Sequence, residues 1–139
     1  MLDFLLEHAR ARGFSPDCAV CPEDVGSGRP KPWMCYRNAV RLQSGPLNAM
    51  VKIGDTPSDI EEGRNAGMWT IGITRTGNET GLTAAEWEAL DDRARARSLS
   101  VGRKRLQAAG AHFVAQSVGE SLEAIERIDE RLQAGEEPW

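Results

Sequence analysis

This sequence of 139 residues lacks long apolar runs, a surplus of positive charge and a basic leader. No apolar run reaches the length of about 18 residues that a transmembrane helix needs, so we expect no membrane partner. Lysine and arginine total 17 against 21 aspartates and glutamates, a net charge of −4, which argues against nucleic acid as a partner. Residues 1–8 carry acids within their apolar stretch and do not resemble a signal peptide, so we expect a cytoplasmic protein.

Metal-binding and redox side chains are also scarce, since the chain has only 3 cysteines and 2 histidines. Cys18 and Cys21 have the C-x-x-C spacing that zinc and redox sites use. A structural zinc site needs four ligands, and His8 and His112 are too far apart in sequence to form a second pair. The spacing therefore favours small buried thiols in a reducing compartment, with a zinc or redox site as the alternative.

The remaining composition, 40% hydrophobic and 27% charged, is that of a globular protein. Apolar runs typical of strands alternate with helical patterns along the chain, which predicts an α/β fold with a parallel sheet covered on both faces. We expect one domain over residues 1–135 and a frayed tail over 136–139. Strands are predicted at 17–21, 50–54, 68–74 and 111–116, and helices at 2–12, 32–43, 57–66, from 83, at 91–107 and at 120–133.

Two of the predicted helices carry finer expectations. The segment 91–107 is rich in arginine, with an unclear break near residues 98–102, and neighbouring acids indicate a solvated face rather than a phosphate-binding patch. In the last helix, the apolar spacing predicts that Leu122, Ile125 and Leu132 face inward.

Two acidic residues follow the predicted strand at 50–54, in the segment Gly-Asp-Thr-Pro-Ser-Asp. Ligands bind to open α/β sheets at the carboxyl ends of strands, where Asp55 and Asp59 are expected. Hard carboxylate oxygens there suit Mg²⁺. Alternatively, Thr56 caps a helix and Asp59 complements its dipole. That alternative leaves Asp55 unexplained.

A second polar segment, residues 28–32 (Gly-Arg-Pro-Lys-Pro), precedes the predicted helix at 32–43. Arg29 lies in a stiff loop between a glycine and a proline. Its guanidinium could hold a phosphoryl group or pair with carboxylates at the next strand end. The alternative is a surface arginine in a turn.

Taken together, residues 28–32 and 54–59 resemble the third and fourth motifs of the haloacid dehalogenase superfamily. The longer stretches 28–36, 51–63 and 65–70 are similar to the phosphonoacetaldehyde hydrolases (phosphonatases) of that superfamily, and so are residues 77–82 and 110–114. The similarity covers nearly the whole chain. It implies a Rossmann-like parallel-sheet core of the haloacid dehalogenase type.

The resemblance also implies a reaction and a set of roles. Phosphonatases cleave the carbon–phosphorus bond of phosphonoacetaldehyde to give acetaldehyde and phosphate, using Mg²⁺, an aspartate nucleophile and a Schiff-base lysine from a cap domain. Asp55 matches the Mg²⁺ ligand, and Asp59 matches the acid that supports the metal's water shell. Arg29 matches the cation that balances charge around the nucleophile and the phosphoryl group. The resemblance further implies a phosphonate substrate and a homodimer, formed largely through the cap, in the complete enzyme.

Parts of the family pattern are missing from these 139 residues. No Asp-x-x-Gly-Thr segment carries a nucleophile, no serine or threonine matches the second motif, and none of Lys31, Lys52 and Lys104 matches the Schiff-base lysine. We therefore expect the C-terminal part of such an enzyme, without the first two core strands and the cap. Such a chain should be inactive by itself and should have a gap in its sheet.

Two other functions remain open. One is a Mg²⁺-dependent phosphatase of the same superfamily, although residues 33–36 and 67–69 resemble phosphonatases specifically. The other is a non-catalytic interaction module in which a partner supplies the missing strands.

Overall fold

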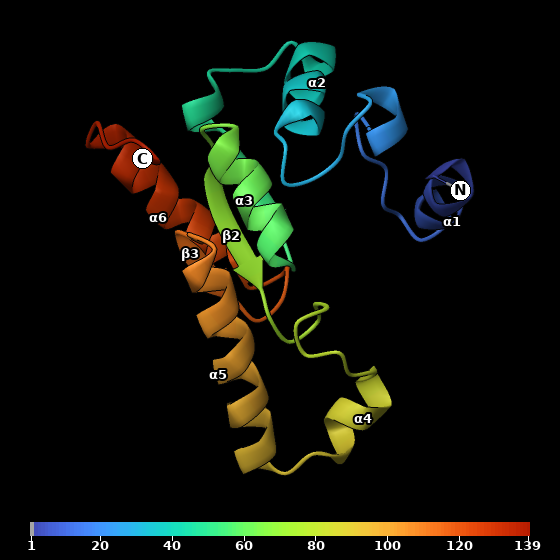
Figure 1. The fold of residues 1–139 in the computed structure, drawn as a ribbon. Helices are drawn as coiled ribbons and strands as arrows, with labels where there is room; N and C mark the ends of the chain where they lie inside the picture. The colour runs from blue at the N-terminus through green and yellow to red at the C-terminus, as the bar shows by residue number, and fades with distance from the viewer. Residues whose placement is uncertain (1) are drawn as a thin grey trace.

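A three-stranded parallel sheet forms the centre of the structure, a computed structural model that describes residues 2–139 (Figure 1). Its strands are β1 (Val51–Gly54), β2 (Trp69–Ile73) and β3 (Phe113–Ala115), in the order β1-β2-β3. All pairing is parallel, with Ile53 opposite Ile71 and Ile71 opposite Phe113. The predicted α/β class with a parallel sheet is confirmed. Met1, the first residue of the predicted domain, lies outside the described residues.

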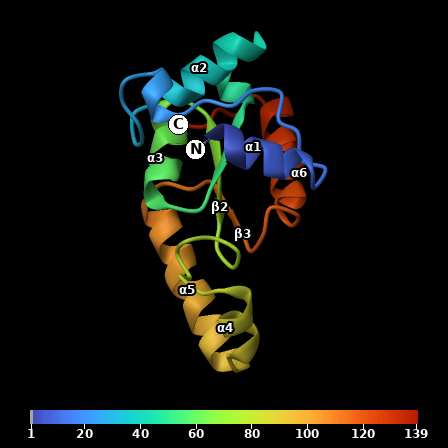
Figure 2. The same cartoon turned by 90° about the vertical axis from the view of Figure 1, so that its right-hand side faces the viewer.

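The predicted helices are all present, with ends that differ by a few residues. They are α1 (Leu2–Arg10), α2 (Trp33–Leu42), α3 (Pro57–Asn65), α4 (Ala84–Ala89), α5 (Asp92–Ala108) and α6 (Ser121–Gln133), with short 3₁₀ turns at Pro22–Asp24 and Leu47–Ala49. Among residues 2–139, no helix combines the length and apolar character needed to cross a bilayer. Two perpendicular views show α2 beyond one end of the sheet and α4 beyond the other (Figures 1 and 2).

The alternation of side chains along β2 assigns the helices to the two faces of the sheet. Trp69, Ile71 and Ile73 form a buried cluster with Ala124 and Ile128 of α6. The intervening residues of β2 face the opposite side, where α3 and α5 pack. All five residues of β2 are buried, which is expected for a central strand covered on both faces.

The inward face of α6 differs from the prediction. Leu122 is 65% exposed and Ile125 is 37% exposed, whereas Ala124 and Ile128 are buried and Leu132 packs partly against them. The inward stripe therefore runs through positions 124, 128 and 132, so the predicted stripe was out of phase at its first two positions. The physical reason is that the small Ala124 lets α6 approach the sheet closely.

The predicted break near residues 98–102 is also wrong, because α5 is continuous from Asp92 to Ala108. Gly102, which suggested a break, is buried in the helix. A Cβ atom there would lie 3.4 Å from Cβ of Glu79 and 3.5 Å from Cγ2 of Thr74. These are ordinary van der Waals separations, so α5 packs directly on the segment after β2 at this position.

The predicted strand at residues 17–21 does not form. This segment is a loop in which Asp17 is exposed and residues 18–21 are partly buried. A strand requires a neighbouring strand to pair its backbone groups. Within residues 2–139, the sheet ends at β1, which pairs with β2 alone. The apolar sequence at 17–21 therefore lacks the partner that would make it a strand.

The segment 136–139, predicted to be a frayed tail, lies against the body of the structure. Pro138 is buried, and its carbonyl accepts hydrogen bonds from Arg64 of α3 and, at 2.9 Å, from Nε2 of His112. Nδ1 of His112 accepts a hydrogen bond of 2.9 Å from the backbone N–H of Thr70. These contacts join the tail to the amino-terminal end of the sheet. That the tail frays in solution stays a prediction.

Candidate active site

The carboxyl end of β1 leads directly into α3, and this junction holds two of the predicted site residues. Thr56 is the N-cap of α3, and its hydroxyl accepts a hydrogen bond from the backbone N–H of Asp59 at 3.3 Å. The Asp59 carboxylate in return accepts hydrogen bonds from the backbone and side chain of Thr56, at 3.2 and 2.6 Å. The helix-capping role considered for these residues is present.

Asp59 does more than cap the helix. Nη1 of Arg29, in the loop before α2, donates a hydrogen bond of 2.6 Å to Oδ1 of Asp59. The Arg29 side chain is 45% exposed, whereas that of Asp59 is buried. The hydrogen bond to Asp59 and its negative charge raise the pKa of Arg29 above its ordinary value. The structure therefore brings together two residues that lie 30 positions apart in sequence.

The charge on Asp59 is stabilised despite its burial. Burial alone would raise its pKa, but the hydrogen bonds from Thr56 and Arg29 and the charges of Lys52 and Arg29 outweigh it and hold the pKa below the ordinary value. Asp59 is therefore ionised in the neutral pH range. Both of its oxygens are already engaged by Thr56 and Arg29, so Asp59 is not available as a direct metal ligand in this arrangement.

Asp55 lies at the end of β1, where its Oδ2 accepts a hydrogen bond of 2.9 Å from the backbone N–H of Asn78. It lines a small cavity of about 180 Å³ together with Thr76 and Val118. A carboxylate and a hydroxyl at a strand end are hard oxygen donors of the kind that Mg²⁺ prefers. Within residues 2–139, no group of three or more His, Cys, Asp or Glu side chains is placed to hold a metal ion. Asp55 thus fits Mg²⁺ as a single protein ligand, with the other positions left to water, substrate or further protein groups.

Two glycines allow the close approaches on which this geometry depends. A Cβ atom on Gly54 would lie 2.2 Å from Cβ of Asp59, which is sterically impossible without movement of α3. A Cβ atom on Gly77 would lie 2.6 Å from Cβ of Asp55 and 2.6 Å from the carbonyl oxygen of Ile73. Glycine is therefore required at position 54 for α3 to pack this closely on the end of β1. It is required at position 77 for the loop after β2 to reach Asp55.

The sequence analysis missed Lys52 and Glu62, which border this site. Nζ of Lys52 lies 2.6 Å from Oε2 of Glu62 and 3.4 Å from Oδ1 of Asp59. A signal was available in the sequence, because Lys52 interrupts an otherwise apolar strand. Glu62 also follows Asp59 by three positions, which places both on one face of α3.

A larger groove lies on the free side of β1. It has a volume of about 440 Å³ and is bounded by the loop that includes Cys18 and Cys21, by Met34 of α2 and by Val51 of β1. The groove thus separates the free edge of β1 from the segment that the sequence predicts to be a strand. The three cysteines are free, and burial raises the pKa of the Cys35 thiol to about 11, so this thiol remains protonated at neutral pH.

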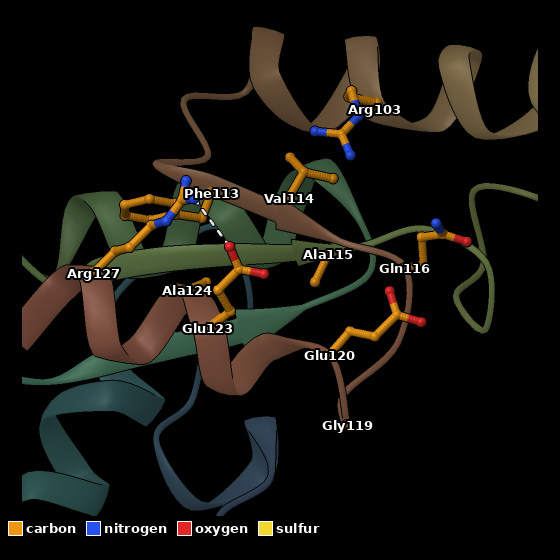
Figure 3. Close-up of a pocket in the computed structure, with 10 residues that line it drawn as sticks. All are labelled: Arg103, Phe113, Val114, Ala115, Gln116, Gly119, Glu120, Glu123, Ala124 and Arg127. Atoms are coloured by element: carbon orange, nitrogen blue, oxygen red, sulfur yellow. Dashed lines mark hydrogen bonds and ion pairs between the residues drawn. The ribbon is translucent and has the colours of Figure 1, made fainter.

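Another cavity, of about 390 Å³, lies along β3 between α5 and α6 (Figure 3). Charged side chains of both signs line it, including Arg103, Glu120, Glu123 and Arg127. Arg127 and Glu123 pair with each other at 2.9 Å and are both largely exposed. This cavity contains no residue of the segments 28–32 and 54–59, so we place the candidate site at the end of β1.

Comparisons with known proteins agree with the motifs. The sequence profile of a family described as HAD-hydrolase-like matches residues 27–99. A protein named phosphonoacetaldehyde hydrolase from Syntrophobacter fumaroxidans is 51% identical over 99% of this chain and 50% of its own length. Another with that name, from Nitratidesulfovibrio vulgaris, is 45% identical over 100% of this chain and 50% of its own length.

A solved structure gives the same picture. The crystal structure of a phosphonoacetaldehyde hydrolase like protein from Oleispira antarctica is similar with a TM-score of 0.94 and 39% identity, over 96% of this chain and 48% of that chain. The chain therefore spans about half the length of these relatives. The predicted incomplete core of the haloacid dehalogenase type is in accord with this coverage.

Proposed function

Because this chain belongs to the HAD-hydrolase-like family, we propose that it supplies one half of the active site of a phosphonoacetaldehyde hydrolase. In this proposal the complete enzyme hydrolyses the carbon–phosphorus bond of phosphonoacetaldehyde to acetaldehyde and phosphate. The relatives that carry this name are about twice as long as the chain and match it over almost its whole length.

The observation that carries the proposal is the Arg29–Asp59 pair at the same strand end as Asp55. The Arg29 guanidinium uses Nη1 for Asp59, and the side chain as a whole is partly exposed. A guanidinium held in this way can bind phosphonate oxygens. Asp59 keeps Arg29 in place and does not itself touch the substrate.

Asp55 is the residue of this chain that would hold Mg²⁺. When bound, the ion would neutralise the negative charge of the phosphonate. The backbone N–H of Asn78 fixes one carboxylate oxygen of Asp55, which leaves the other free to face a ligand. Arg29 and Asp55 therefore have different roles in this proposal. The guanidinium binds the phosphonate, and the carboxylate binds the metal.

The groove beside β1 supports a second part of the proposal, namely that another polypeptide segment completes the sheet. Within residues 2–139 the outer edge of β1 has no pairing strand, and the facing loop at 17–21 has a strand-like sequence without a partner strand. The occupant we propose is an apolar extended segment equivalent to the half of the relatives that this chain does not match. By itself, the chain should not release phosphate, because it lacks the nucleophile and the Schiff-base lysine of the family.

A phosphatase of the same superfamily would use the same Asp55 and Arg29. The two reactions differ in the product that accompanies phosphate, since only phosphonoacetaldehyde hydrolysis yields acetaldehyde. An interaction module without catalysis would bind the complementary half but would show no Mg²⁺ response at Asp55.

Titration of the isolated chain with Mg²⁺, monitored by NMR of the backbone amides, tests the metal-binding role. We expect the amide resonances of Asp55 and Asn78 to shift, with millimolar or weaker affinity because the chain supplies one carboxylate. Asp55→Asn should abolish the shift, and the exposed Asp92→Asn should leave it unchanged. Shifts that persist in Asp55→Asn, or that centre on α3 instead, would count against the assignment.

A further inference from the structure

Four charged side chains form one cluster between the loop before α2, β1 and α3. Arg29 and Lys52 provide two positive charges, and Asp59 and Glu62 provide two negative ones. The cluster is neutral as a whole. Glu62 is fully buried, Asp59 is nearly so, and the Lys52 side chain is 22% exposed, so these charges interact with little screening by solvent.

Arg29 and Lys52 both approach the same oxygen of Asp59. Oδ2 is occupied by the backbone and hydroxyl of Thr56, which leaves Oδ1 for both cations. Nη1 of Arg29 lies 2.6 Å from Oδ1 and Nζ of Lys52 lies 3.4 Å from it. Arg29 therefore cannot form a two-pronged bond with Asp59, and its remaining donors stay outside the pair.

Lys52 lies closer to Glu62 than to Asp59. Oε2 of Glu62 accepts a hydrogen bond of 2.6 Å from Lys52, which is closer than the distance from Lys52 to Asp59. Oε1 of Glu62 has no hydrogen-bond partner within residues 2–139. Burial alone would lower the pKa of Lys52, but the hydrogen bond to Glu62 and the charges of Glu62 and Asp59 raise it, so Lys52 stays charged.

We propose that Lys52 is a positioning residue for Arg29 that acts through Asp59, and that Glu62 is the counter-ion that sets the strength of this action. Lys52 shares Oδ1 of Asp59 and so prevents Arg29 from being drawn fully into the cluster. Without Lys52, Arg29 is the only cation facing two buried carboxylates and is held more tightly. Without the charge on Glu62, Lys52 turns toward Asp59 and Arg29 is released. The functional meaning rests on the proposed phosphonate-binding role of Arg29.

Two substitutions separate this role from a purely structural one. Lys52→Met and Glu62→Gln each remove the Lys52–Glu62 ion pair, so any loss of stability should have the same sign in both. The positioning role instead predicts that the two substitutions change the proton exchange of Arg29 in opposite directions. In Lys52→Met the exchange of the Arg29 guanidinium protons should slow by about threefold or more, and in Glu62→Gln it should quicken by a similar factor, in keeping with coupling within one charge network.

The experiment is NMR on the isolated chain, with measurement of Arg29 side-chain proton exchange and of the Asp59 carboxyl titration. The Asp59 titration should move to higher pH in Lys52→Met and to lower pH in Glu62→Gln. The charges of Arg29 and Lys52 act directly on Asp59, Glu62 binds Lys52, and the Cys35 thiol responds to the charge of Asp59. Lys104→Met, which changes an exposed lysine on α5, should alter neither readout.

Shifts of the same sign in both variants, or no change at Arg29, would overturn the proposal. Glu62→Gln preserves side-chain shape, so its result decides the question even if Lys52→Met fails to fold. None of these readouts requires hydrolysis of a phosphonate. If the complete enzyme does not hydrolyse phosphonoacetaldehyde, the results expected for Arg29 and Asp59 are unchanged. If those NMR results are not obtained, the proposed activity is not refuted.

Discussion

Asp55→Asn is expected to abolish phosphate release by this chain once it is assembled with the half of a phosphonoacetaldehyde hydrolase that it does not match. The substitution keeps the shape of the side chain but removes its charge, which is what a Mg²⁺ ligand supplies. Substitutions of residues that only support metal ligands reduce metal affinity or activity by about 10–100-fold. Loss of the ligand itself should therefore reduce the rate by at least about 100-fold. The rate of phosphate release from phosphonoacetaldehyde is the measurement.

Asp92→Asn is the matched control, since Asp92 is fully exposed at the start of α5 and should leave the rate unchanged. An excess of Mg²⁺ should restore part of the activity of Asp55→Asn if the defect is in metal affinity. A variant that retains more than about a third of the wild-type rate would exclude Asp55 as the metal ligand, because no direct ligand is that dispensable.

Gly54→Ala should produce the largest loss of stability around the site. The added methyl group would lie 2.2 Å from Cβ and 2.7 Å from Cγ of Asp59, so the start of α3 must move away from β1. That movement breaks the Thr56–Asp59 capping box and pulls Asp59 from Arg29. Overpacking of this kind costs about 1–3 kcal/mol, and loss of the helix cap adds about 1 kcal/mol.

Urea denaturation followed by circular dichroism measures this change in the free energy of unfolding. Gly119→Ala is the control, because a Cβ there would meet nothing closer than Oγ of Ser117 at 3.9 Å. It should change the free energy of unfolding by less than about 0.5 kcal/mol. Equal stabilities for the two variants would show that the strand end and α3 are not packed as described.

Much of the fold could be predicted from the sequence because the local patterns and the tertiary structure agree. The apolar runs at β1, β2 and β3 and the capping residues Thr56 and Thr83 specify strands and helices without reference to distant parts of the chain. The failures occur where an element depends on something beyond its own residues. The segment at 17–21 has a strand-like sequence but no neighbouring strand within the part of the chain that the structure describes. The orientation of α6 depends on the close packing of Ala124 against the sheet.

In the site, too, local sequence patterns identified some residues, and others depend on tertiary packing. The motifs identified Arg29, Asp55 and Asp59, and the contact between Arg29 and Asp59 follows one of the interpretations offered for that loop. The positions of Lys52 and Glu62 beside the site could not be predicted from spacing alone. A lysine in a strand is commonly an edge residue facing solvent, and only the packing of α3 on β1 turns Lys52 toward two buried carboxylates.

The most direct test of the account is the product analysis of an assembled enzyme. The chain would be combined with the half of the Syntrophobacter fumaroxidans phosphonoacetaldehyde hydrolase that it does not match, and incubated with phosphonoacetaldehyde and Mg²⁺. We predict a stable complex that releases acetaldehyde and phosphate in equal amounts, while neither half is active separately. A stable complex that forms neither product, or that releases phosphate only from phosphate monoesters, would contradict the account.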